Sequence, residues 1–239
     1  MEITVMIPTY NEATNVERMI NDVLNCGADA QVLIVDDMSP DGTYKIVQKI
    51  AETNPKVHLL LRKEKKGRGH AGKEGFKKAL DMGARYIVEM DGDGSHSPKY
   101  IPGMREMING CDIVIGSRYV KGGKDEDRSF FRQLISNPSR WYLSLVMGLK
   151  IKDSTSGYRM FKREVLESFA DKLKADDPFI ISETLYYIKK NKFSVKEYPI
   201  EFLSRMSGES KLRPWTMIKY LFKGQPRSEE RRVGKECRS

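Results

Sequence analysis

Two aspartates separated by one glycine, Asp91 and Asp93, directly follow a short apolar run in this 239-residue chain. The run, residues 86–90 (YIVEM), has the aromatic and β-branched composition of a buried strand. Glycines at 92 and 94 leave the backbone free to bring both carboxylates towards one point. Paired carboxylate oxygens suit a hard cation, Mg²⁺ or Mn²⁺, which usually also takes phosphate oxygens from a substrate. The pattern predicts a metal site, with an ordinary Asp-Gly turn as the alternative.

A second stretch able to bind anions is the basic, glycine-rich segment 65–72 (KKGRGHAG). Arg68 and the flanking lysines indicate contact with phosphates. The glycines fit G-x-G-x-x-G between a predicted strand and a predicted helix, and Asp91 lies nineteen residues beyond Gly72. A dinucleotide site is therefore an alternative. The segment follows the third predicted strand, however, and no other residues support redox chemistry.

Strands and helices that alternate at short spacing must position these residues. Apolar runs predict buried strands, and apolar residues three and four apart predict helices between them. Such alternation is typical of a doubly wound, mostly parallel sheet with helices on both faces, whose ligands bind at the carboxyl ends of the strands. The predicted strands are 3–7, 31–35, 57–61, 86–90 and 111–115, and the helices between them follow residues 14, 43, 72 and 98.

The second half of the chain is less regular. We expect a loop at 119–127, short helices at 160–169 and 179–188, a strand at 194–202, a flexible basic segment at 204–211 and an amphipathic stub at 215–222. In the apolar segment 129–147, Arg132, Ser136 and Arg140 recur every four residues. This stripe indicates either the solvated edge of a core helix or a helix at a membrane surface that presents polar groups to a lipid phosphate.

The formal net charge of +9 favours anionic partners such as phosphorylated molecules, anionic lipid or nucleic acid. Residues 227–239 carry five basic and three acidic residues and no apolar pattern, so we interpret them as a non-native tail; the remainder keeps +7. The basic residues are scattered without interleaved aromatics, which argues against nucleic acid. The three cysteines lack paired or metal-site spacing and indicate a reducing compartment. With neither a signal peptide nor an apolar run of about 18 residues, we expect a soluble or peripheral chain.

Seven short motifs occur in an order that resembles the family 2 glycosyltransferases with a GT-A fold, above all the dolichyl- and polyprenyl-phosphate mannose synthases. The resemblance covers residues 3 to about 212. The motifs are PTYNE (8–12), DDMSPDGT (36–43), GRGHA (67–71), MDGDGSHSP (90–98), GSRY (116–119), TSGYR (155–159) and RMSGESKL (205–212). Ser95 departs from the pattern, because relatives often carry a longer polar residue such as glutamine there.

The resemblance implies a role for each matching position. A pocket for the nucleotide base and ribose would involve Pro8, Tyr10, Glu12 and Asp37. Asp91 and Asp93 correspond to the acids of the family's D-x-D motif, which hold Mg²⁺ or Mn²⁺. A basic loop with Arg205 and Lys211 would close over the donor diphosphate. The phosphate of an acceptor lipid would be held by Arg118, Arg132 and Ser136. For each arginine alone, a surface salt bridge of little energetic value is the alternative.

The implied activity is an inverting, metal-dependent transfer of a hexose, most readily mannose from GDP-mannose, to dolichyl or polyprenyl phosphate. Alternatives are glucosyl transfer from UDP-glucose, a family 2 transferase with another acceptor, and a catalytically silent nucleotide-sugar-binding module. The four charged residues Asp91, Asp93, Arg118 and Arg205 argue against a silent module.

We expect one catalytic domain, residues 1–226, whose part 115–226 faces the acceptor and the membrane. Net charge, the segment 130–147 and the stub 215–222 favour peripheral attachment at the cytoplasmic face of a membrane. The resemblance is also compatible with a partner subunit that anchors the protein to the membrane. Some relatives continue into transmembrane helices, and a native chain longer than this sequence is an alternative.

Overall fold

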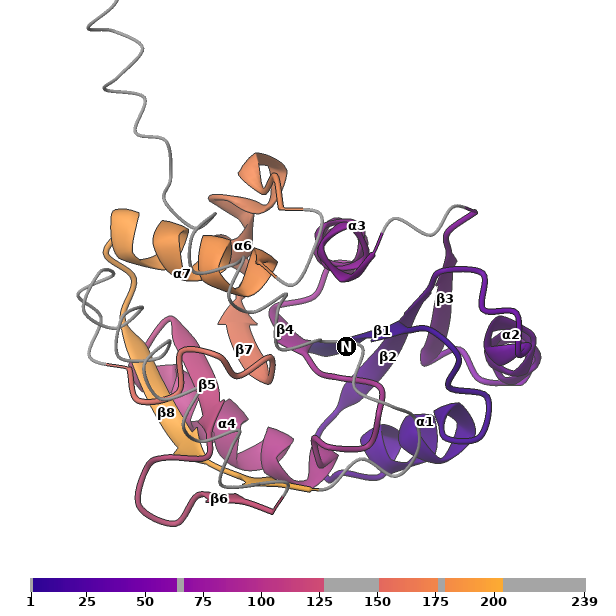
Figure 1. The fold of residues 1–239 in the computed structure, drawn as a ribbon, viewed down its shortest axis with the longest axis horizontal. Helices are drawn as coiled ribbons and strands as arrows, with labels where there is room; N and C mark the ends of the chain where they lie inside the picture. Colours follow the sequence, from indigo (N-terminus) through magenta and orange to yellow (C-terminus); the bar gives the residue numbers. More distant parts are fainter. Residues whose placement is uncertain (1, 64–66, 127–150, 176–178, 204–239) are drawn as a thin grey trace, which may run out of the picture. The chain divides into compact units, whose positions relative to one another are not determined.

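The computed structural model describes residues 2–63, 67–126, 151–175 and 179–203 (Figure 1). The chain divides into two compact units, Met1–Gly208 and Glu209–Ser239. All the described residues belong to the first unit, and the description below concerns that unit alone. The predicted boundary between a catalytic domain and a tail after residue 226 stays a prediction.

The described part of the chain is built on a seven-stranded sheet with the order β3-β2-β1-β4-β7-β5-β8. Neighbouring strands are parallel except around β7, which runs antiparallel to both β4 and β5. This confirms the predicted doubly wound, mostly parallel sheet. A parallel two-stranded sheet adds β6 and β9. The strands are β1 (Ile3–Thr9), β2 (Ala30–Asp36), β3 (Val57–Leu61), β4 (Tyr86–Glu89), β5 (Ile113–Ser117), β6 (Lys124–Asp125), β7 (Arg159–Lys162), β8 (Val195–Pro199) and β9 (Glu201–Phe202).

Helices cover both faces of the sheet (Figure 1). Alternate residues of each strand point to opposite faces, so Val5 packs in one core cluster and Met6 in the other. The first cluster includes residues of α1 (Val16–Leu24), α2 (Thr43–Thr53) and α4 (Ile101–Met107), and the second includes residues of α3 (Arg68–Asp81), α6 (Arg163–Glu167) and α7 (Ile180–Lys190). Short 3₁₀ turns lie at Pro98–Tyr100, Ile108–Gly110 and Ala170–Lys172.

The prediction of a helix over 160–169 was wrong in its first part. Arg159–Lys162 forms β7, and the helix that follows covers only Arg163–Glu167. Met160 and Phe161 are completely buried, because β7 fills the gap between β4 and β5 and pairs with both. Tertiary pairing thus overrides a local pattern too short to distinguish a strand from a helix.

The glycine-rich segment is also more helical than expected. Helix α3 begins at Arg68, so Gly69 and Gly72 belong to its first turns. A Cβ atom at Gly72 would lie 2.9 Å from Cδ1 of Ile180, and one at Gly75 would lie 2.8 Å from Cγ of Met6. These two glycines therefore allow α3 to pack closely against α7 and the sheet.

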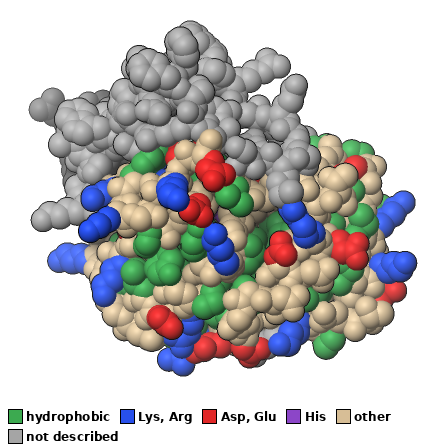
Figure 2. Space-filling view, turned by 90° about the horizontal axis from the view of Figure 1, so that it is seen from below, with side chains coloured by type: hydrophobic (Ala, Val, Ile, Leu, Met, Phe, Trp, Pro, Cys, Tyr) green, Lys and Arg blue, Asp and Glu red, His purple; other side chains and the backbone are tan. Residues whose placement is uncertain are grey.

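Charged side chains of both signs share the face seen in Figure 2. Among the described residues, Glu201 pairs with two lysines: its carboxylate lies 3.3 Å from Nζ of Lys99 and 3.0 Å from Nζ of Lys124. Lys99 and Lys124 are therefore partly neutralised by a nearby acid.

Candidate active site

The predicted donor residues come together at one edge of the sheet. Pro8 lies in β1, with Tyr10 and Glu12 in the loop that follows, and Asp37 directly follows β2. The predicted acids of residues 91 and 93 follow β4, the neighbour of β1 on its other side. The carboxyl ends of three adjacent parallel strands thus supply all six residues, which is where open α/β sheets bind ligands.

The loops after β1 and β2 are bonded to each other. The buried carboxylate of Asp36 accepts hydrogen bonds from Oγ1 of Thr9 at 2.8 Å and from the backbone N–H and Oγ of Ser39 at 2.8 and 2.7 Å. Oγ of Ser39 in turn accepts the N–H of Asn11 at 3.0 Å. These bonds fix the two loops relative to each other, so a ligand between them meets a preformed surface.

Asp37 pairs with an arginine that the sequence did not single out. Nη1 of Arg62 forms a buried ion pair with Oδ1 of Asp37, and Nε of Arg62 lies 3.2 Å from Oε2 of Glu74. Burial raises the pKa of Asp37, although the positive charge of Arg62 opposes the shift. The arginine therefore holds the Asp37 carboxylate in a place where burial alone would favour its neutral form.

Hydrogen bonds within residues 91–96 hold the turn that carries the two acids. Oδ1 of Asp93 accepts the N–H of Ser95 at 3.1 Å and its Oγ at 2.5 Å, and Gly94 adopts a positive φ of 80° that completes the turn. The N–H of Asp91 donates to Nδ1 of His96 at 3.1 Å. The buried His96 ring stacks on Tyr158 with centroids 5.0 Å apart, and its burial lowers its pKa. The imidazole is thus held as a neutral acceptor beneath Asp91.

The chemistry of this donor set fits a divalent cation completed by a substrate. Asp91 and Asp93 supply hard carboxylate oxygens, and Ser95 already orients one oxygen of Asp93. In the described ranges of the chain, no group of three or more His, Cys, Asp or Glu side chains is placed to hold a metal by itself. Mg²⁺ and Mn²⁺ sites of this kind usually combine one or two protein carboxylates with water and substrate phosphates. Asp91 and Asp93 therefore remain the predicted metal ligands.

Arg68 is the cation that the structure places against Asp91. Its Nη2 lies 2.5 Å from Oδ1 of Asp91 and 4.0 Å from Oε1 of the buried Glu89 at the end of β4. Burial raises the pKa of Glu89, while the charge of Arg68 opposes that shift. A Cβ atom at Gly157 would lie 2.7 Å from Nη2, so the glycine makes room for the guanidinium. The sequence indicated phosphate contact for Arg68, and its partnership with an acid was missed.

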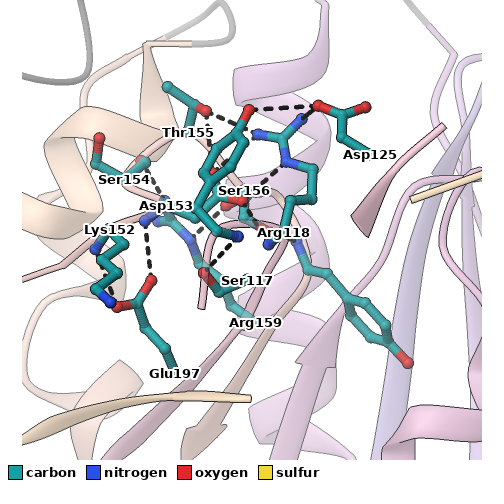
Figure 3. Close-up of polar contacts among 12 residues, drawn as sticks. Ser117, Arg118, Asp125, Lys152, Asp153, Ser154, Thr155, Ser156, Arg159 and Glu197 are labelled. Atoms are coloured by element: carbon teal, nitrogen blue, oxygen red, sulfur yellow. Dashed lines mark hydrogen bonds and ion pairs between the residues drawn. The ribbon is translucent and has the colours of Figure 1, made fainter. Parts of the chain in front are cut away.

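Arg118, predicted to hold an acceptor phosphate, follows β5 and forms a buried ion pair with Asp153 (Figure 3). Nε and Nη2 of Arg118 donate to the two oxygens of Asp153 at 2.8 Å each, and Nη2 also donates to Oγ1 of Thr155 at 3.0 Å. Burial alone would raise the pKa of Asp153, but these bonds outweigh it and leave that pKa below its ordinary value. The arrangement is firmer than an exposed salt bridge, and a phosphate-binding role stays a prediction.

Arg159, at the start of β7, fixes the loop that contains Asp153. Its completely buried guanidinium donates to the carbonyl oxygens of Ser156 at 2.8 Å, Ser154 at 3.1 Å and Ile181 at 3.1 Å. Burial lowers its pKa to about 10, partly offset by the charges of nearby acids. Three backbone acceptors let this arginine act as an internal brace between the loop and α7. The signal that could have revealed it is an arginine that ends a polar motif inside an apolar sequence.

The segment 152–157 connects the two parts of the site. Glu197 of β8 accepts the backbone N–H groups of Lys152 at 2.9 Å and Asp153 at 2.8 Å (Figure 3). From this anchored start, the segment contacts Arg118 through Thr155 and passes Asp91 at Gly157. One short loop therefore touches both the arginine after β5 and an acid after β4.

The remaining predicted site residues lie outside the described residues, and their roles stay predictions. They are Arg132, Ser136, Arg205 and Lys211. The same holds for the predicted helices in 129–147 and 215–222. Within the ranges that the structure describes, no helix combines the length and apolar character needed to cross a bilayer.

Comparison with known proteins identifies the family. The family model described as glycosyl transferase family 2 matches residues 4–169. The chain belongs to this family. The six residues predicted for the donor side and Arg118 all lie inside the matched range of this family 2 glycosyltransferase. The predicted family and enzyme class are confirmed.

Curated relatives of this glycosyltransferase include the "Polyprenol monophosphomannose synthase" of Mycolicibacterium smegmatis, which is 38% identical over 92% of this chain and 84% of that protein. The "Undecaprenyl-phosphate mannosyltransferase" of Micrococcus luteus is 36% identical over 89% of this chain and 88% of that protein. The "Dolichol-phosphate mannosyltransferase" of Pyrococcus furiosus is 40% identical over 92% of this chain, which spans only 62% of the Pyrococcus protein.

Solved structures confirm the GT-A type of fold. The mannosyltransferase PcManGT from Pyrobaculum calidifontis, in complex with GDP-Man and Mn²⁺, aligns with a TM-score of 0.56 and 22% identity over 86% of this chain and 58% of that chain. Glucosyl-3-phosphoglycerate synthase from Mycobacterium tuberculosis aligns with a TM-score of 0.65 and 18% identity over 95% of this chain and 81% of that chain. At these identities the likeness concerns the fold alone.

Proposed function

We propose that this family 2 glycosyltransferase transfers mannose from GDP-mannose to a polyprenyl or dolichyl phosphate, with inversion at the anomeric carbon. The observation that carries the proposal is the shared edge at which Asp37, Asp91 and Asp93 follow β2 and β4, with Arg118 two strands further along the sheet. The names of the three curated relatives, each a mannose transferase that acts on a polyprenyl-type phosphate, support the choice of sugar and acceptor.

On the donor side, the chain's task is to bind the nucleotide and to accommodate a departing diphosphate. The bonded loops after β1 and β2, with Tyr10 and Glu12, would hold base and ribose, and Asp37 is fixed beside them by Arg62. Asp91 and Asp93 would hold the divalent cation, which when bound balances the negative charge that gathers on the leaving diphosphate. Arg205 and Lys211 would add positive charge from the segment that follows β9.

On the acceptor side, the chain needs no general base. A phosphate monoester has a second pKa near ~6 and is largely dianionic at neutral pH. One of its oxygens forms the new bond to the anomeric carbon as the bond to the diphosphate oxygen breaks on the opposite side. The role of Arg118, with Arg132 and Ser136, is orientation, for which a guanidinium braced by Asp153 is suited because its plane is fixed before the phosphate arrives.

A lipid-linked acceptor would bring the enzyme to a membrane surface. We propose peripheral attachment at the cytoplasmic face, through the segments 130–147 and 215–222 and the chain's excess of basic residues. A membrane-anchoring partner subunit is a second route to the same location, and co-purification from detergent extracts of the native membrane would distinguish the two.

The decisive experiment offers labelled GDP-mannose and labelled UDP-glucose to the purified chain, each with polyprenyl phosphate in detergent, with and without EDTA. We expect label in the organic-extractable fraction with GDP-mannose, loss of that label with EDTA, and recovery with excess Mg²⁺ or Mn²⁺. Extractable label only from UDP-glucose would replace the sugar assignment. Label found only on a water-soluble acceptor would overturn the lipid-phosphate proposal.

A further inference from the structure

The ion pair between Arg68 and Asp91 occupies the position where the proposed metal ligand must receive its cation. Nη2 of Arg68 lies 2.5 Å from Oδ1 of Asp91. A divalent cation bound to that carboxylate would meet a like charge a few ångströms away, where repulsion in a partly buried setting is strong. Either the arginine moves when the cation binds, or it weakens the binding.

The details of the contact favour movement. Nε of Arg68 is enclosed and makes no hydrogen bond within the described part of the chain, and Nη2 is the atom that approaches both Asp91 and Glu89. The contact with Asp91 is made through Nη2 at one end of the guanidinium, so few hydrogen bonds are lost when the side chain leaves. Asp153 and Arg118 show the contrast, because that pair is locked by two hydrogen bonds of 2.8 Å.

A second acid is available to receive the displaced guanidinium. Oε1 of Glu89 lies 4.0 Å from the same Nη2 atom, two residues before Asp91 along the chain. A small rotation of the long side chain exchanges one carboxylate for the other. Arg68 also lies at the first position of α3, where only its side chain has to move while its backbone stays in the helix.

We infer that Arg68 is an exchangeable counter-ion of the metal site: it neutralises Asp91 before the divalent cation binds, and it shifts towards Glu89 when the cation takes its place. This inference rests on the proposed metal site and adds a positioning residue that tunes it. Its consequence is a metal affinity below what two carboxylates alone would give, so that firm binding requires the donor's phosphates as well.

The test measures Mn²⁺ binding at neutral pH by electron paramagnetic resonance of the free ion, without nucleotide. For Arg68→Gln, removal of the competing charge should tighten Mn²⁺ binding by roughly tenfold, the size expected for one nearby charge in a partly buried site. Arg68→Lys keeps the charge and should stay within about threefold of wild type. Arg105→Gln removes an arginine paired at 2.7 Å with Glu2, which precedes β1 at the opposite edge of the sheet, and should leave Mn²⁺ affinity unchanged.

Two outcomes separate this inference from the metal site on which it rests. If Asp93→Ala binds Mn²⁺ as well as wild type, the metal-site assignment fails. If Asp93→Ala loses binding but Arg68→Gln binds Mn²⁺ no more tightly than wild type, the metal site stands and the counter-ion role of Arg68 is overturned.

A measurement on the unmodified protein covers the case in which Arg68→Gln does not fold. In a nitrogen-15 spectrum of arginine Nε groups, the signal missing from Arg68→Lys identifies Arg68. Addition of Mg²⁺ should shift that signal and leave the signal of Arg105 in place. A constant Arg68 signal at saturating Mg²⁺ would overturn the inference.

Discussion

Arg118 binds both oxygens of the Asp153 carboxylate, Nε to Oδ2 and Nη2 to Oδ1, at 2.8 Å each. The Asp153 side chain is completely buried, and the Arg118 side chain is 16% exposed. The guanidinium predicted to orient a lipid phosphate therefore donates hydrogen bonds to protein groups, namely Asp153 and Thr155. Any phosphate bound there would meet a guanidinium whose position is set by Asp153.

The first prediction concerns the stability of this pair. Asp153→Asn should lower the free energy of unfolding at neutral pH by about 2–3 kcal/mol, because charge-assisted hydrogen bonds of a buried carboxylate are lost. The pKa of Asp153 is lowered in the folded state, so its contribution is present above its ordinary value of 3.8 and is lost as the pH falls through the folded-state pKa. Urea unfolding should therefore show the difference between the two proteins shrinking below about pH 4.

The matched control is Asp29→Asn, which breaks an exposed ion pair with Lys56 of 3.1 Å. That change should cost less than about 1 kcal/mol. Equal losses for the two variants would contradict the view that burial and bidentate geometry make the Asp153 pair strong.

The second prediction concerns the proposed metal ligands. Asp93→Ala should abolish metal-dependent turnover and Mn²⁺ binding, because a lone carboxylate at residue 91 holds a divalent cation poorly. Asp112→Ala is the control: this acid precedes β5, at the opposite edge of the sheet, and accepts a hydrogen bond of 2.6 Å from Ser194. Label transfer in the extraction assay measures both. Full activity of Asp93→Ala would remove residue 93 from the site.

The third prediction separates acceptor from donor binding. Arg118→Lys and Arg132→Ala should each raise KM for the lipid phosphate by about tenfold or more, the value of one charge-assisted hydrogen bond. Neither should change the affinity for GDP measured by calorimetry. Arg85→Gln, which alters an exposed arginine 3.4 Å from Glu2, should change neither quantity. An unchanged lipid-phosphate KM in both arginine variants would place the acceptor elsewhere.

The fourth prediction concerns backbone strain beside the nucleotide loops. Met38 follows Asp37, is half exposed and adopts a φ of 52°, in the left-handed region that long side chains rarely occupy. Met38→Asn should raise the free energy of unfolding by about 0.5–1 kcal/mol, because asparagine tolerates this conformation. Met38→Val should lower it by about 1–2 kcal/mol, because a β-branched residue tolerates it least. Urea unfolding measures the free energy of unfolding of both variants. A change of the same sign in both would contradict the conclusion that Met38 is strained.

The strand pattern allowed most of the sheet and the donor side of the site to be predicted. Long apolar runs ended in polar motifs, and parallel strands bring such ends to one edge, so Asp37, Asp91 and Asp93 could be grouped before any coordinates were known. The family resemblance assigned their roles. Arg118 was placed correctly after a strand, but its partner Asp153 lies 35 residues away in sequence.

What sequence reasoning missed are contacts between distant segments. β7 is four residues long, and its identity depends on β4 and β5 on either side. Arg68 was interpreted as a phosphate ligand, because a basic glycine-rich stretch is typical of one, and nothing local showed that Asp91 and Glu89 would stand opposite it. The role of Arg159 was also missed, because its partners are backbone carbonyl oxygens, which no residue type in the sequence reveals.

The reversed direction of β7 decides which residues reach the edge of the sheet that carries Asp91 and Arg118. β4 and β5 both finish at this edge, whereas β7 starts there, so Arg159 and the residues just before it lie between the ends of β4 and β5. Had β7 run parallel, that edge would have received the end of the strand, and Asp153, Thr155 and Gly157 would have entered the opposite side of the sheet. The inverted strand thus keeps the segment 152–157 at the edge where Asp91 and Arg118 lie, so that one braced loop borders both residues.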